Sequence, residues 1–343
     1  MTLADLLAGI VVVSLNAYVL FGGADFGGGV WDLLASGPPA RKREQRALIG
    51  EAIGPVWEAN HVWLILAVVL LFTCFPPVFA QLGIRLHIPF ALALIGIVLR
   101  GSAFAFRSYG GQRDEVQRRW GRLFAIASLI TPLLLGTAVG AIASGAIGDE
   151  GRGTGDGFYR VYVAPWLTPF ALSVGVFALV AFAFLAAVYL TLEAEEGELR
   201  EEFRRRGLGA GVALGFAALA ALLLARRGAP RVAEGLVFAP WALPLHVVTA
   251  AAAVTALWAL WRRRYRIARI AAAGQVSLIF WGWPLSQYPD ILPPDYAIAD
   301  VAAPDATLRL ALGAIALGAV VLFPSLWYLF RVFKKAPSMK VGA

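Results

Sequence analysis

Long stretches of apolar residues alternate along this chain with short polar connections, many of them rich in arginine. A bilayer core of ~30 Å is crossed by ~20 apolar residues in a helix. Inside lipid the backbone must satisfy its own hydrogen bonds, so such stretches form helices rather than open sheets. The period-two alternation of a membrane-spanning barrel is absent from the sequence. The pattern therefore predicts an all-α fold, a polytopic transmembrane helical bundle.

About nine stretches are long enough to cross the membrane, and we treat the chain as a single integral membrane domain over residues 1–343. The nine predicted spans are Leu6–Leu34, Pro55–Phe75, Val78–Leu99, Leu123–Ile147, Pro165–Leu192, Leu208–Ala225, Pro240–Trp261, Ile267–Pro284 and Leu308–Phe330. The longest polar connections are about Arg100–Arg122, Gly148–Ala164, Glu193–Arg206 and Pro284–Thr307. The first span has no basic residue before it and is too long for a signal-peptide core.

The basic residues are divided unevenly between the connections on the two sides. One set of connections holds 23 of the 30 Lys and Arg. That set lies around Arg41–Arg46, Arg100–Arg122, Arg200–Arg206, Arg262–Arg269 and the tail from Arg331. The positive-inside rule makes this side cytoplasmic, which places the N-terminus outside and the C-terminus in the cytoplasm. An odd number of spans requires the same arrangement; the basic loop at Arg226, Arg227 and Arg231 is the exception.

The composition agrees with a multi-pass protein of the cell inner membrane. Hydrophobic residues make up 59% of the chain and charged residues 15%, whereas soluble domains are about a quarter charged. The net charge of +8 follows mainly from the basic loops on one side. We therefore expect no nucleic-acid partner, because no folded domain carries a basic surface.

Residues that bind metals or cofactors are few. Cys74 is the only cysteine, so the sequence has no disulfide framework and no CxxC motif. The three histidines are His61, His87 and His246, and both methionines are terminal. Several haems need several axial His or Met ligands. We predict no metal site and no haem bound by this chain alone, and Cys74 is interpreted as ordinary packing.

Glu58 is the strongest candidate for a functional acid. The charge-free run Val62–Phe75 has 14 residues, too few to span, so the helix must begin earlier and carry Glu58 into the cytoplasmic half of the membrane. Placing a carboxylate inside the membrane costs roughly 3 kcal/mol on insertion scales. An acid found there therefore usually has a function or a buried partner. The alternative is a structural acid held by hydrogen bonds. Burial would favour proton loading by Glu58, with His61 on roughly the same helix face and Asn60 turned away.

Asp25 is the second candidate, near the end of the first span. Gly23 and Gly27 flank it at the spacing of a small-xxx-small contact, which lets a second helix approach closely. The alternative role for Asp25 is an interfacial carboxylate paired with a nearby arginine such as Arg100.

Four segments resemble one known family. Residues 22–29, GGADFGGG, resemble the GFDxGxG end of the first helix in subunit II of cytochrome bd-type quinol oxidases. Residues 53–64, IGPVWEANHVWL, closely resemble the family's second-helix signature, GPxWD/EGNxVWL, and include Trp57, Asn60 and Trp63. Residues 99–107, with Arg100, look like its third-helix end, and Trp281-Gly-Trp283-Pro resembles its last outside loop. The nine-span layout extends the resemblance to the whole chain.

The resemblance implies a role in aerobic respiration. Complexes of this family take electrons from a membrane quinol, which becomes quinone, and reduce oxygen to water. Haem b and haem d are expected in the partner, subunit I. Subunit II is generally haem-free, packs against subunit I among membrane lipid, and supplies part of a cytoplasmic proton path. For this chain the resemblance implies no complete active site, and a proton path through Glu58, Asp25 and His61.

The chain departs from the family at two positions. Many relatives carry acids where this chain has Gly22 and Ala105, and Glu58 stands where an Asp is common. His61 could compensate, since imidazole relays protons near neutral pH. Two alternatives stay open: a secondary transporter, which also uses intramembrane acids and glycine-broken helices, and a divergent haem-free scaffold or assembly protein.

Overall fold

The structure, a computed structural model, describes residues 2–54, 57–109, 114–148 and 157–335. Its long helices are α1 (Leu3–Leu33), α3 (Trp57–Cys74), α5 (His87–Tyr109), α6 (Asp114–Ala143), α8 (Pro169–Glu193), α9 (Glu198–Gly228), α11 (Ala242–Trp261), α12 (Tyr265–Gln287) and α14 (Asp305–Lys335). Shorter helices connect them: α2 (Pro39–Ile53), α4 (Pro76–Arg85), α7 (Phe158–Tyr162), η1 (Ala164–Trp166), α10 (Pro230–Phe238) and α13 (Ile298–Val301). Strands β1 (Asp290–Leu292) and β2 (Tyr296–Ala297) pair antiparallel. The predicted all-α bundle is confirmed.

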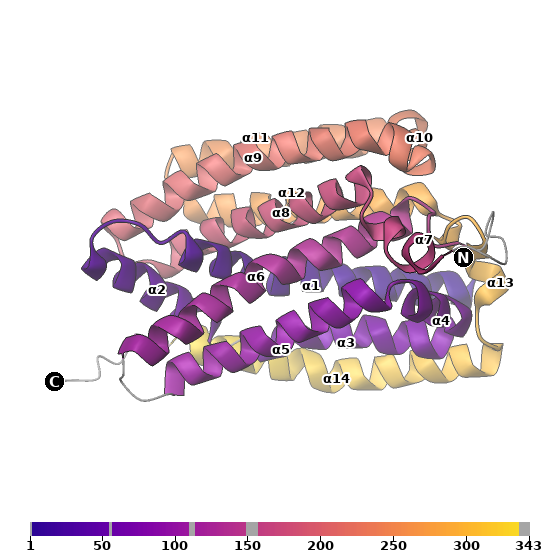
Figure 1. The fold of residues 1–343 in the computed structure, drawn as a ribbon, viewed down its shortest axis with the longest axis horizontal. Coiled ribbons are helices and arrows are strands. Elements are labelled where there is room, and N and C mark those ends of the chain that lie inside the picture. The colour runs from indigo at the N-terminus through magenta and orange to yellow at the C-terminus, as the bar shows by residue number, and fades with distance from the viewer. Residues whose placement is uncertain (1, 55–56, 110–113, 149–156, 336–343) are drawn as a thin grey trace.

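Eight helices in the described residues are long and apolar enough to cross a membrane. The eighth of the nine predicted spans, Ile267–Pro284, corresponds to α12, which falls outside that set and includes Arg266, Arg269 and Gln275. The chain nevertheless alternates between the two ends of the bundle. Helices α4, α7, α10 and α13 lie at the end where the N-terminus is, and α2 lies at the other (Figure 1). We call these the N-terminal end and the α2 end.

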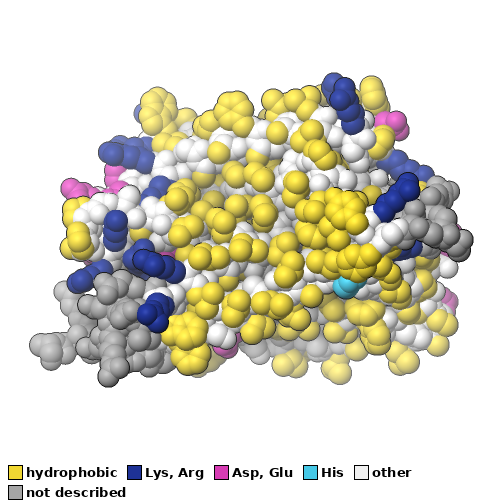
Figure 2. All heavy atoms as spheres, viewed as in Figure 1, with side chains coloured by type: hydrophobic (Ala, Val, Ile, Leu, Met, Phe, Trp, Pro, Cys, Tyr) yellow, Lys and Arg dark blue, Asp and Glu magenta, His cyan; other side chains and the backbone are white. Residues whose placement is uncertain are grey.

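The exposed surface has the distribution of side chains that a bilayer requires. Figure 2 shows apolar side chains covering the middle of the molecule, with Lys and Arg gathered toward its two ends. Large apolar residues such as Phe72, Phe216 and Leu317 are exposed by more than half of their area. In water this surface would favour aggregation, so it is the lipid- or partner-facing surface of a membrane protein.

Helix α8 lies at the centre of the bundle and packs closely against α1. A Cβ at Gly23 would lie 2.6 Å from the Phe182 ring, and a Cβ at Gly27 would overlap the Phe182 carbonyl. The two helices therefore approach closely only because glycine stands at these positions, as the spacing predicts. Phe26 also stacks on Phe182, with ring centroids 6.4 Å apart.

Two predicted boundaries are wrong. The span predicted at Val78–Leu99 is two helices: α4 ends at Arg85, and the membrane span begins at His87. Both segments are apolar, so hydropathy alone merges them. The connection predicted at Arg100–Arg122 is largely helical as well, because α5 continues to Tyr109 and α6 begins at Asp114. Arg100, counted among the loop residues, is buried inside α5.

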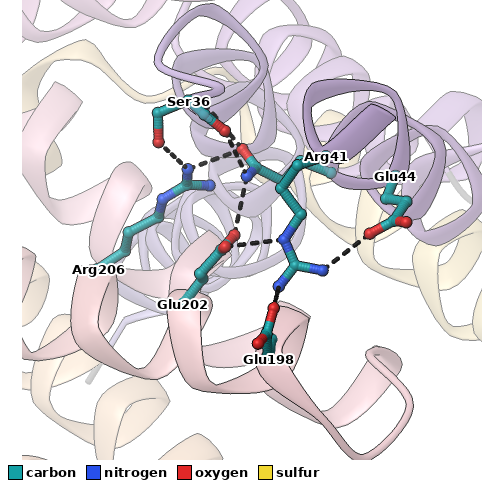
Figure 3. A network of polar contacts seen from close by, with 7 residues as sticks. Ser36, Arg41, Glu44, Glu198, Glu202 and Arg206 are labelled. Carbon is teal, nitrogen blue, oxygen red and sulfur yellow. Dashed lines mark hydrogen bonds and ion pairs between the residues drawn. The ribbon is translucent and has the colours of Figure 1, made fainter. Parts of the chain in front are cut away.

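A polar network fixes α2 across α9 at the α2 end (Figure 3). The Arg41 guanidinium contacts Glu202 and Glu44, each at 2.8 Å, and Gln45 Nε2 donates to Glu202 at 2.8 Å. Arg206 donates in turn to Gln45 Oε1 at 2.8 Å. The hydrogen bond to Glu202 raises the pKa of Arg41 above its ordinary value, so the cation persists. This network makes α2 a fixed part of the bundle rather than a loose loop.

Helix α14 is the least enclosed of the spans. In its most apolar stretch, none of the residues is buried against the rest of the chain. It is held near its start, where the Ala303 N–H donates to the Cys74 carbonyl at 2.8 Å and Leu308 is buried. Farther along, Phe323 lies against Trp63 of α3, with centroids 6.5 Å apart.

Candidate functional site

Asp25 of α1 and Asn60 of α3 form a buried polar pair in the bundle. Asp25 is 6% exposed and Asn60 is 4% exposed. The Asn60 side-chain N–H₂ donates to Asp25 Oδ2 at 2.7 Å. The sequence predicts only that Asn60 turns away from Glu58; in the structure its side chain points to Asp25. A neutral donor of this kind satisfies the carboxylate without adding a fixed charge.

Arg100 supplies a positive charge to the same region. Its side chain is fully buried in α5, and Nε donates to Ser128 Oγ at 3.2 Å. The guanidinium lies over the Phe26 ring, 4.7 Å from the centroid, and over the Phe124 ring at 5.3 Å. The charges of Arg100 and Asp25 are close enough to interact. A buried arginine is tolerated where acids and aromatic faces compensate it.

A cavity of about 70 Å³ opens onto the Asp25–Asn60 pair. Its walls come from five helices: Phe21, Ala24, Asp25 and Gly28 of α1, Ala52 and Ile53 of α2, Asn60 of α3, Ala186, Tyr189, Leu190 and Glu193 of α8, and Arg269 of α12. A cavity of this size, with the polar groups of Asp25, Asn60, Glu193 and Arg269 among its mainly apolar walls, has room for several water molecules. Asp25 is therefore buried from lipid but not sealed from water.

Glu58 stands in the first turn of α3 and is exposed on the surface of this chain. Its predicted place in the cytoplasmic half of the membrane stays a prediction, and the structure adds that no other part of this chain covers it. The predicted immersion rested on span length alone, which fixes depth but not the direction in which a side chain points. Glu58 is also absent from the cavity walls.

His61 lies between two aromatic rings. Its ring centroid is 5.7 Å from Tyr18 of α1 and 6.2 Å from Trp57. Trp57 also contacts Phe104 of α5, at 6.0 Å between centroids. The family motif thus packs α3 against both α1 and α5.

The two positions without the family's acids have different environments. A Cβ at Gly22 would lie 2.7 Å from the Tyr18 ring, so a longer side chain there needs Tyr18 to move. Ala105 lies on α5 and is partly exposed. Neither position lines the cavity.

The sequence interpretation missed three charged residues near the site. Asp32 is 2% exposed and binds Arg107 at 2.8 Å, with Arg46 at 3.7 Å. Its spacing of seven residues from Asp25 puts both acids on one side of α1. Glu193 and Arg269 line the cavity but stand at span ends, where charged residues are common and carry little signal.

Metal ligation has little support in the part of the chain that the structure describes. Those residues contain no group of three or more His, Cys, Asp or Glu that could hold a metal ion. His87 Nδ1 lies 2.9 Å from the Ile84 carbonyl, and His246 Nδ1 lies 2.7 Å from the Ala242 carbonyl. The three histidines sit on three different helices. That the haems belong to a partner stays a prediction.

Comparison with known proteins identifies the family. The sequence matches the family described as cytochrome bd terminal oxidase subunit II over residues 3–333. It is 23% identical over 329 residues to a putative cytochrome bd menaquinol oxidase subunit II of Bacillus subtilis, covering 93% of this chain and 92% of that protein. It is 34% identical over 137 residues to the cytochrome bd ubiquinol oxidase subunit 2 of the same organism, covering 39% of this chain and 38% of that protein.

The fold has a solved counterpart. A chain in the structure of the bd oxidase from Geobacillus thermodenitrificans superposes with a TM-score of 0.79 and 24% identity, covering 97% of this chain and 99% of that chain. This likeness concerns the fold. The family match over nearly the whole sequence goes further: this chain belongs to the cytochrome bd terminal oxidase subunit II family.

Proposed function

We propose that this chain is the haem-free subunit of a membrane complex that oxidises quinol and reduces oxygen, and that it carries protons from the cytoplasmic side toward a haem-bearing partner, subunit I. The observation that carries the proposal is Asp25, a buried carboxylate that is paired with Asn60 and lines a cavity with room for several waters. Oxygen reduction consumes protons, and a lipid-excluded acid in contact with water is suited to deliver them.

The partner surface is proposed to include the exposed side of α3. Glu58 is exposed there at the start of a membrane span, and facing lipid would be costly for a carboxylate. A polar surface of a partner subunit removes that cost. In this arrangement Glu58 meets the partner and passes protons across the interface, while Asp25 and His61 serve the path inside this chain.

The haems are assigned to the partner because of ligand chemistry. His87 and His246 are engaged with backbone carbonyls, and His61 lies among aromatic rings. Purified without its partner, the chain should show no stoichiometric haem absorption. A low-spin haem spectrum in the isolated chain would contradict this, and His61 would then be the first ligand to test.

The proton role is tested on the assembled, fully haem-loaded complex. Asp25→Asn should lower quinol-oxidase turnover by about tenfold or more, the lower part of the range for proton-transfer groups. Glu58→Asp should keep much of the turnover, whereas Glu58→Gln and Glu58→Leu should lose most of it. Wild-type turnover in Glu58→Gln would make Glu58 a structural residue. A loss of haem in step with activity would make its role interface support.

A further inference from the structure

The cavity beside Asp25 has walls of two kinds. Asp25 and Asn60 are buried. Glu193 is the last residue of α8, and Arg269 lies near the start of α12; both side chains are partly exposed. Of the charged residues in the lining, these two are the ones within reach of solvent, and we take the cavity to open beside them. They lie toward the α2 end, which the positive-inside rule assigns to the cytoplasm.

We infer that Glu193 is the proton inlet of this chain, taking protons from the cytoplasmic solvent and passing them through the cavity to Asp25. The inference rests on the proposed function, because it supplies the route by which Asp25 is reloaded. The Glu193 carboxylate binds a proton from bulk water, and a chain of cavity waters moves the equivalent proton to the Asp25 carboxylate. Glu193 is then ionised again, and no other reactant is required.

The geometry favours Glu193 over Glu58 for this step. Glu193 and Asp25 line one continuous cavity of about 70 Å³, whereas Glu58 does not line it. Waters in such a cavity bridge groups that are too far apart for a direct hydrogen bond. Glu58 is exposed on α3, so the two acids serve opposite ends of the path: Glu193 at the inlet and Glu58 at the partner.

Arg269 of α12 packs against α8 close to Glu193 and so helps to hold these two helices together at the cavity. Its guanidinium lies over the Tyr189 ring of α8, 5.0 Å from the centroid, and Tyr189 also lines the cavity. This contact ties α12 to α8 at the level of Glu193.

The test compares variants of the haem-loaded complex across a range of pH. Glu193→Gln should slow turnover by about tenfold at alkaline pH, since protons are then scarce and water alone must reload Asp25. The loss should shrink toward acidic pH, and Glu193→Asp should restore most of the rate. The matched control is Glu195→Gln, which removes an exposed carboxylate two residues away that does not line the cavity.

A second variant tests the water path without removing any charge. Ala52→Leu places a larger side chain in the cavity wall and should slow turnover with the same pH dependence. Wild-type rates in both Glu193→Gln and Ala52→Leu, with Asp25→Asn still impaired, would overturn the inlet and leave the proposed function standing. Full turnover in Asp25→Asn would overturn both. A loss in Glu193→Gln that is equal at every pH would assign Glu193 a structural role and overturn the inference.

Discussion

Two carboxylates near the α2 end of the bundle lie in opposite surroundings. Asp25 is 6% exposed, accepts a hydrogen bond from Asn60 and feels the charge of the buried Arg100. Glu58, on the neighbouring helix α3, is exposed on the surface of the chain. The carboxylate of Asp25 is thus enclosed within the chain, whereas that of Glu58 is free to contact a partner subunit. Side-chain direction, rather than depth in the membrane, separates the two.

The largest expected effect comes from disturbing the helix pair that encloses Asp25. Gly27→Leu should prevent assembly of most of the complex, because its side chain would overlap the Phe182 backbone of α8. Overpacking of ordinary cores costs about 1–3 kcal/mol, and backbone overlap costs more. The control is Gly9→Leu on the same helix, where a Cβ would meet nothing within 4 Å. A normal yield of Gly27→Leu would mean that α1 and α8 separate without penalty.

Removing Asp25 should lower the free energy of unfolding much more than removing Glu58. Asp25→Leu leaves Arg100 and Asn60 without a carboxylate partner and should lower the free energy of unfolding by about 3–5 kcal/mol, as for other broken buried pairs. Glu58→Leu should change it by less than about 0.5 kcal/mol. Chemical unfolding of the chain purified alone in detergent measures both. Equal losses would remove the distinction between the two acids.

A smaller effect is expected from Asn60, which shapes the surroundings of Asp25 without being ionised. Asn60→Leu removes the hydrogen bond that the amide donates to the Asp25 carboxylate and should cost about 1.5–3 kcal/mol of stability, as for hydrogen bonds to charged groups. Turnover of the assembled complex should fall less than in Asp25→Asn, because the carboxylate remains. If Asn60→Leu were as inactive as Asp25→Asn, the amide itself would belong to the proton path.

The mildest test concerns exposure of the Glu58 position. Glu58→Cys should react readily with a soluble thiol reagent in the isolated chain, while the native Cys74, which is fully buried, should not. In the assembled complex the same position should be protected if the partner covers this part of α3. Equal labelling with and without the partner would place the interface elsewhere.

The spans could be predicted from the sequence because a long apolar run in a bilayer satisfies its backbone hydrogen bonds by forming a helix. The boundary between α4 and α5 could not, since residues on both sides of Arg85 are apolar and hydropathy does not record a change of direction. Helix α2 was missed for the opposite reason. It is a polar helix whose place depends on Glu202 and Arg206 of α9, more than 150 residues away in the chain.

The site was predicted only in part. Span length and the glycine pattern pointed to Asp25 and to a close neighbour helix, but the identity of its hydrogen-bond partner depends on how α1 and α3 cross. For Glu58, span length predicts a depth in the membrane but not the direction of the side chain, so its exposure on the surface of this chain could not be predicted. The cavity is lined by residues from five helices. A local sequence pattern does not show which residues of distant helices meet.

The bare surface of α14 has a consequence for the order in which the protein is made. Every residue that lines the cavity lies between Phe21 and Arg269, whereas α14 begins at Asp305 and adds little buried surface. During synthesis, all residues that line the cavity therefore leave the ribosome before the last span does. The helices around the cavity can therefore pack together first. The last helix, α14, can insert afterwards and be covered by lipid or by the partner subunit.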